Sequence, residues 1–111
     1  MLPKFKRLNL KRSFKWVASG NKIDTPFFKI MYQFGENDFP LVGIAASKNN
    51  FKKAVDKNRA RRLVSVAIQN LYPNLRNNLN LVIMPRAAIL EKSPKDIEQT
   101  LKNVKAIYKS N

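Results

Sequence analysis

The segment from residue 53 to residue 72 most constrains the fold, because it carries the clearest helical pattern in the chain. Six apolar residues recur at intervals of three and four, the spacing of one helix face: Ala60, Leu63, Val64, Ala67, Ile68 and Leu71. At about 100° per residue, the opposite face collects Asn58, Arg62, Ser65 and Gln69. The pattern predicts a long helix with one buried stripe and one polar face, ended by Pro73.

Strand patterns lie on either side of this helix. Residues 27–34 alternate, with Phe28, Ile30, Tyr32 and Phe34 on one apolar face. Turn-forming residues follow, and residues 41–47 form a second apolar run, so we expect a hairpin-like pair over 27–47. The other segments predict a short helix at 11–19, a short extra strand near 21–25, a buried strand at 79–84 and a helix at 93–109 with Ser93 as its N-cap.

This order of elements predicts one α+β domain over residues 1–111, with a sheet of three or four strands and helices on one face. The other sheet face is expected to be partly open, with Lys29, Met31 and Gln33 available to a ligand. Residues 1–10 read as a loosely ordered basic arm.

Charge is concentrated in two segments. The chain has 22 Lys and Arg against 7 Asp and Glu, a net charge of +15, and segments 4–15 and 48–62 each carry +6. Solubility alone calls for much less charge in a small domain. The imbalance therefore favours a polyanionic partner such as a nucleic acid. A merely solvated surface and an anionic membrane are the alternatives, although segment 48–62 lacks the apolar half of a membrane-surface helix.

Other functions are excluded by residues that are missing. The sequence has no Cys and no His. Thiol nucleophiles, imidazole acid–base catalysis, disulfides and the usual zinc sites are therefore absent. A reducing cytoplasmic environment fits this composition, and no apolar run approaches the roughly 20 residues of a membrane span.

The start of the long helix is unusually basic. Residues 47–62 read SKNNFKKAVDKNRARR. A helix N-terminus carries partial positive charge and normally prefers acidic residues. Cations at this position make sense if an anion binds there, where backbone N–H groups add phosphate donors and arginine can grip a phosphate with two hydrogen bonds.

This segment resembles the signature of the bacterial ribonuclease P protein component, whose core motif is Arg-Asn-Arg. Here the motif reads Lys57-Asn58-Arg59, followed by Ala60-Arg61-Arg62-Leu63. Upstream, Val42-Gly43-Ile44 and Ser47-Lys48 are similar to the family, as are Arg7-Leu8 and Phe14 near the N-terminus. The resemblance covers nearly the whole chain.

The resemblance implies a small αβ sandwich similar to the second domain of ribosomal protein S5, with a left-handed βαβ crossover that holds the basic helix. It also implies a function: a cytoplasmic protein subunit, one per catalytic RNA, that helps ribonuclease P remove the 5′ leader of precursor tRNA. The endonucleolytic chemistry is expected to belong to the RNA and its bound Mg²⁺, so we expect no catalytic residue and no metal site in the protein.

The resemblance assigns two groups of site residues. The RNA-binding group is Lys48, Lys52, Lys53, Lys57, Asn58, Arg59, Arg61 and Arg62. The leader is expected in a cleft between the first helix and the open sheet face, lined by Lys11, Arg12, Phe14, Lys29 and Met31. The position of Phe14 fits two interpretations, a residue that lines the cleft and an ordinary core residue. Met31 stands where the family commonly has an aromatic residue.

The chain departs from the family in its long helix. Lys57 replaces the first arginine of the motif, and Ser65 and Val66 stand where the family often has an arginine and an acid or amide. RNA contacts one turn further along the helix are therefore not expected to follow the family. The alternative function is a non-catalytic RNA-binding or ribosomal protein with an S5-like fold, which the charge alone would also suit.

Overall fold

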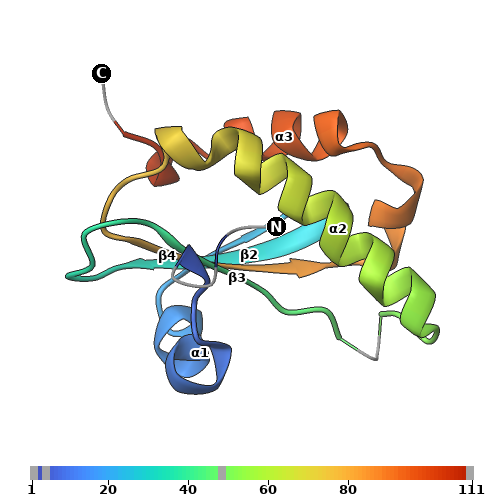
Figure 1. Cartoon of the computed structure of the whole chain (residues 1–111), viewed down its shortest axis with the longest axis horizontal. Helices are drawn as coiled ribbons and strands as arrows, with labels where there is room; N and C mark the ends of the chain where they lie inside the picture. Colours follow the sequence, from blue (N-terminus) through green and yellow to red (C-terminus); the bar gives the residue numbers. More distant parts are fainter. Residues whose placement is uncertain (1–2, 4–5, 48–49, 110–111) are drawn as a thin grey trace.

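In the computed structural model, two helices lie on one face of a four-stranded sheet and a third helix lies on the other (Figure 1). The structure describes residues 3, 6–47 and 50–109. The helices and strands are α1 (Leu10–Ala18), β1 (Asn21–Asp24), β2 (Phe28–Phe34), β3 (Leu41–Ile44), α2 (Ala54–Leu71), β4 (Leu79–Pro85) and α3 (Pro94–Lys102). Short 3-10 turns occupy Tyr72–Asn74, Ala87–Glu91 and Lys105–Ile107.

The sheet has the order β1-β2-β4-β3, so the predicted hairpin between β2 and β3 is wrong. β4 is inserted between them, antiparallel to β2 and parallel to β3, and α2 connects the two parallel strands. β4 takes the central place because it is apolar on both faces, which suits a strand covered from both sides. The loop between β2 and β3 crosses the end of β4, where buried Asn80 donates to Asn37 Oδ1 at 2.9 Å.

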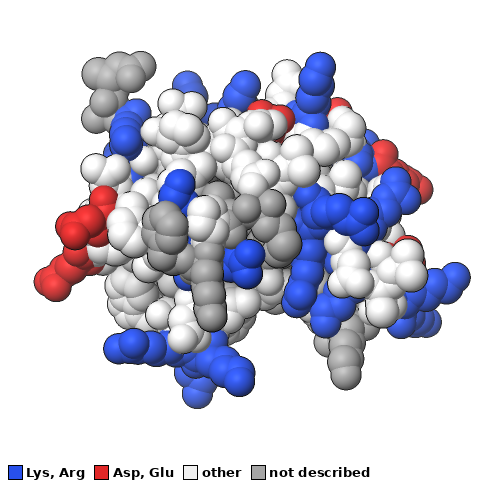
Figure 2. Space-filling model, in the orientation of Figure 1, with Lys and Arg blue, Asp and Glu red and all other residues white. Residues whose placement is uncertain are grey.

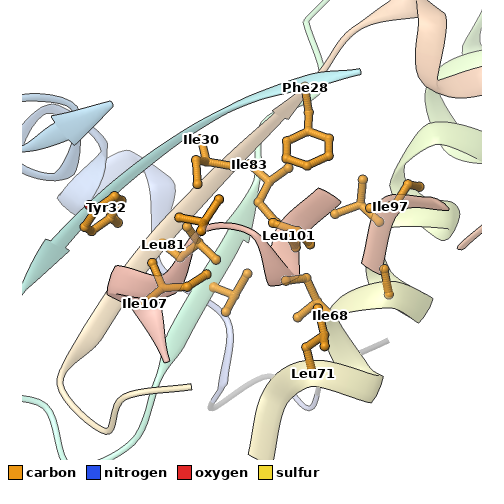
Figure 3. Close-up of a cluster of buried hydrophobic side chains, with 14 of the residues drawn as sticks. Phe28, Ile30, Tyr32, Ile68, Leu71, Leu81, Ile83, Ile97, Leu101 and Ile107 are labelled. Atoms are coloured by element: carbon orange, nitrogen blue, oxygen red, sulfur yellow. The ribbon is translucent and has the colours of Figure 1, made fainter. Parts of the chain in front are cut away.

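The main core lies between the sheet and the pair α2 and α3 (Figure 3). As predicted, β2 turns Phe28, Ile30 and Tyr32 into this core, while Phe34 at the end of the strand is half-buried. These side chains meet residues from β4, α2 and α3: Leu81, Ile83, Ile68, Leu71, Ile97 and Leu101. Burying each large aliphatic side chain contributes about 1.5–3 kcal/mol, so this layer holds the helices on the sheet.

The second sheet face is covered by α1, contrary to the prediction that all helices share one face. Met31 of β2 and Val82 of β4 pack under α1 with Val17 and Leu8, forming a second, smaller core. This face needs a covering helix because the residues at its centre, Met31 and Val82, are apolar. The prediction of a loosely ordered arm over residues 1–10 is wrong at Leu8, which is buried and whose N–H donates to Val42 O at 3.0 Å.

α2 follows its predicted bounds within one residue, but one residue of its predicted polar face is buried. Ser65 is only 5% exposed, because the flank of α2 on which it lies faces β3 and the N-terminal segment at Leu8 and Leu10. The stripe residues Ala60, Val64, Ala67, Ile68 and Leu71 are buried as expected.

The C-terminal helix is shorter than the predicted segment 93–109. Ser93 caps α3 as expected: its Oγ accepts from Asp96 N at 3.3 Å, and Asp96 Oδ2 accepts in return from Ser93 N at 3.0 Å. The helix ends at Lys102 because Val104 leaves the helical region, with φ −89° and ψ 79°. The chain then folds back so that Ile107 can enter the core, where its carbonyl accepts from Arg76 N.

Candidate nucleic-acid interface

The basic segment predicted from the sequence forms the start of α2 and the residues just before it. The apolar stripe of α2 turns into the core, which directs the motif side chains outward. Six of the predicted RNA-binding residues are exposed: Lys52, Lys53, Asn58, Arg59, Arg61 and Arg62. Lys57 is half-buried, and Lys48 lies outside the described residues.

The N-terminus of α2 is open to an anion. Lys53 occupies the N-cap position with an extended backbone, and its side chain makes no capping hydrogen bond. Asp56 is the one acid of the first turn. The first backbone N–H groups of a helix have no intrahelical acceptor, so those of α2 can donate to a phosphate, in a field that the surrounding cations make strongly positive.

Three cations elsewhere on the molecule illustrate how such side chains find partners within the chain. Arg86 pairs with Asp24 at 2.6 Å, the one ion pair among the described residues. Arg76 lies over the ring of Phe34 and Lys92 lies over that of Phe27. By contrast, no ion pair or ring contact within the described chain engages the arginines of α2, which therefore remain available to an external anion.

A second basic surface is formed by α1, on the opposite face of the sheet. Asn9 begins this helix by accepting from Arg12 N at 3.3 Å. The apolar side of α1 packs on the sheet, which leaves Lys11, Arg12 and Lys15 exposed. Figure 2 shows cations over α1 at the lower left and along α2 at the right, with the acids at the margins of the view.

The sheet surface beside α1 is only partly covered. Strand register places Lys29 of β2 directly opposite Met84 of β4, and both are half-buried. Phe14 of α1 is also half-buried, against the second core. Phe14 and Met84 thus pack on the same small core, Lys29 lies next to Met84, and Lys11 and Arg12 are exposed on the helix that carries Phe14. Phe14 has both a packed and an accessible side.

Met31 does not belong to this surface. Its side chain is 3% exposed beneath α1, so the prediction that it is available to a ligand is wrong. Met84 holds the accessible position instead. The sequence contained a signal for it, since alternation along 79–84 puts Met84 on the same face as Asn80 and Val82. Trp16 is a second surface residue that the sequence patterns did not single out. Its side chain is 43% exposed on α1, on the side of the helix away from Phe14.

No metal site is apparent in the part of the chain that the structure describes, where no three acidic residues lie close enough together to hold an ion. Within the same residues, no helix is long and apolar enough to cross a membrane.

Together the fold and these two surfaces define a small, basic α+β protein suited to binding a polyanion through two helices. Comparison with known families makes this specific. The model of the Ribonuclease P family matches residues 2–109. The chain therefore belongs to the ribonuclease P protein family.

Individual relatives agree with the family. The ribonuclease P protein component of Pseudoalteromonas translucida is 30% identical over 77 residues, which span 69% of this chain and 54% of that protein. The match with this relative thus covers about half of its length. The component from a Pseudanabaena species is 27% identical over 108 residues, which span 96% of this chain and 93% of the relative.

Solved structures share the fold. The ribonuclease P protein of Thermotoga maritima, determined in complex with 1-(4-fluorophenyl)-2-thiourea, superposes with a TM-score of 0.77 at 20% identity, covering 88% of this chain and 95% of that one. A mutant of the Staphylococcus aureus protein with defective mRNA degradation activity superposes with a TM-score of 0.82 at 16% identity, covering 95% and 92%. The predicted αβ sandwich is confirmed.

Proposed function

We propose that this chain is the protein subunit of ribonuclease P, which binds the catalytic RNA and the 5′ leader of precursor tRNA and assists endonucleolytic removal of the leader. One protein joins each catalytic RNA in the cytoplasm. The observation that carries the proposal is the start of α2, where the family motif presents exposed arginines that no ion pair or ring contact among the described residues engages.

The catalytic RNA binds along α2. Asn58, Arg59, Arg61 and Arg62 project from two successive turns, and Lys52 and Lys53 extend the surface toward the open N-terminus. Guanidinium groups bind phosphates through paired hydrogen bonds, and the lysines add point charges. Phosphate contacts of this kind position an RNA without reading its sequence.

The leader binds on the other side of the sheet, along the strip that contains Phe14, Lys29 and Met84. A single strand is held by cations along its backbone and by apolar or aromatic surfaces under its bases. Lys11 and Arg12 border the strip on α1. Phe14 and Met84 offer the surfaces for bases, the role first assigned to Met31.

In this proposal, Mg²⁺ is bound mainly by the RNA and the substrate. The protein contributes cations that lower repulsion between phosphates of the catalytic RNA and the substrate, and no acid or base for hydrolysis. Its effect should therefore be largest where Mg²⁺ is scarce, because both kinds of cation screen the same phosphates.

The test is reconstitution with a bacterial ribonuclease P RNA and measurement of precursor-tRNA cleavage at low Mg²⁺. The proposal predicts faster cleavage with the protein, and a smaller gain as Mg²⁺ is raised. A folded protein that gives no stimulation at any Mg²⁺ concentration would contradict it. Co-sedimentation with ribosomes and no effect on tRNA 5′ ends would instead support the ribosomal alternative.

A further inference from the structure

A cavity of about 250 Å³ lies between α2, β3 and the N-terminal segment, separate from the strip beside α1. Its walls are mostly apolar, and two arginines also line it, Arg7 of the N-terminal segment and Arg61 of α2. The apolar lining includes Leu8, Val42, Ile44 and Ile68. Pockets for drug-sized ligands are generally somewhat larger. This cavity therefore suits one flat ring system better than an extended ligand.

A serine hydroxyl is also present in the cavity wall. Ser65 lines the wall and is 95% buried, yet its side chain makes no hydrogen bond with any described residue. A serine within a helix usually satisfies its hydroxyl with water or with the carbonyl one turn earlier. Among the described residues, the buried side-chain atom without a partner is the Tyr108 hydroxyl and not that of Ser65, so the Ser65 hydroxyl is accessible and can bond to a ligand in the cavity.

The edge of β3 supplies further polar groups. Val42 O points outward and accepts from Leu8 N, and Ala45 N points inward to Ile83 O. Backbone direction alternates along a strand, so the N–H and C=O of Ile44 point outward, toward the cavity. No described residue bonds to them. The wall thus offers a donor and an acceptor side by side, beside the Ser65 hydroxyl.

We propose that this cavity holds one unstacked nucleobase of the RNA bound along α2, a proposal that rests on the function proposed above. The apolar walls contact the faces of the base, while Ser65 and Ile44 bond to its polar edge. Of the two arginines in the wall, Arg61 is the one that belongs to the basic surface of α2, so it contacts the phosphate of the same nucleotide. An aliphatic anion would leave the polar groups unpaired, which is why the base fits better.

The first experiment fills the cavity. Ser65→Leu places an aliphatic side chain inside it, and Gln69→Leu adds the same side chain one turn away at an exposed position. We expect Ser65→Leu to weaken binding of the catalytic RNA about tenfold, within the range measured for loss of one stacked base, and Gln69→Leu to bind like the wild type. The slope of affinity against salt should not change, because neither variant removes a charge.

A milder variant and a direct probe cover the case in which Ser65→Leu fails to fold. Ser65→Ala keeps the cavity open and removes the hydroxyl, so RNA affinity should fall about threefold, the effect of one hydrogen bond. Separately, AMP, GMP, CMP and UMP are titrated into the whole protein at millimolar concentration. At least one should shift the amide resonances of Val42, Ile44 and Ser65, and Ser65→Leu should abolish the shift.

The outcomes separate the two proposals. If Ser65→Leu is folded and binds RNA as Gln69→Leu does, or if Ser65→Ala has no effect and no mononucleotide shifts these amides, the cavity holds no base. Nucleotide shifts confined to other surfaces would overturn the proposal in the same way. If the wild-type protein fails to bind the catalytic RNA while mononucleotides still enter the cavity, the proposed function fails and the base site stands.

Discussion

Replacing Arg59 and Arg62 together by alanine removes two cations from the surface proposed to bind the catalytic RNA. Both side chains are exposed, and neither belongs to the buried stripe of α2. Alanine is at least as good a helix former as arginine, and exposed substitutions usually change stability by less than about 0.5 kcal/mol each. The variant should therefore melt cooperatively, within a few degrees of the wild type.

The expected loss in binding is much larger than the loss in stability. If each arginine makes a charge-assisted bond to one phosphate, each contributes about 1.5 kcal/mol. Two such losses weaken the affinity roughly 100-fold, because 1.4 kcal/mol corresponds to a factor of ten. The slope of log affinity against log salt should also become shallower by about 1.4–1.8, since each lost phosphate contact contributes about 0.7–0.9.

The assay is a titration of catalytic RNA at several salt concentrations, with a control matched in charge. Lys102→Ala with Lys105→Ala removes two exposed cations from the last turn of α3 and the 3-10 turn that follows it, at the opposite end of α3 from Pro94, which adjoins Arg59 and Arg62. The control variant should bind the catalytic RNA with nearly the wild-type affinity and with nearly the wild-type slope of log affinity against log salt. Equal losses in both double variants would show that net charge, rather than the surface of α2, determines binding, and the reasoning would be refuted.

Three further predictions address the leader strip and the core. Phe14→Ala should weaken binding of precursor tRNA to the holoenzyme about tenfold without affecting mature tRNA; equal effects on both would mean that Phe14 only packs. Met31→Ala should lower the free energy of unfolding by about 2–3 kcal/mol in a denaturant titration, whereas an open ligand surface at Met31 would leave it unchanged. Ser93→Ala should cost about 1 kcal/mol. Hydrogen bonds from Ser93 lower the pKa of Asp96, and a lowered pKa stabilises the fold above the unfolded-state pKa of about 4. The difference in stability between Ser93→Ala and the wild type should therefore shrink as the pH falls below that value. A difference that is constant with pH would contradict this linkage.

The helices and strands, and the outward direction of the α2 cations, could be predicted because each depends on residues that are close together in the sequence. The period of α2 separates its stripe from Arg59 and Arg62, and charged side chains are rarely buried without partners. The capping of α3 by Ser93 was equally visible, since the serine precedes a proline and an acid in the first turn.

The arrangement of the elements could not be predicted in the same way, because it depends on contacts between distant segments. Nothing within 27–47 shows that β4 comes between β2 and β3. The burial of Met31 requires α1 to lie across the second sheet face, and the burial of Ser65 requires the N-terminal segment beside α2. Those contacts place Met84, rather than Met31, on the proposed leader surface, and they form the cavity at Ser65.

The central claim is that this chain works on a catalytic RNA. The most direct measurement is the identity of the RNA that co-purifies with the tagged full-length protein from its own cells. The account predicts strong enrichment of one RNA that cleaves precursor tRNA when supplied with Mg²⁺ alone, and loss of that enrichment in the Arg59→Ala, Arg62→Ala variant. Enrichment of ribosomal RNA instead, unaffected by the double substitution, would contradict the account.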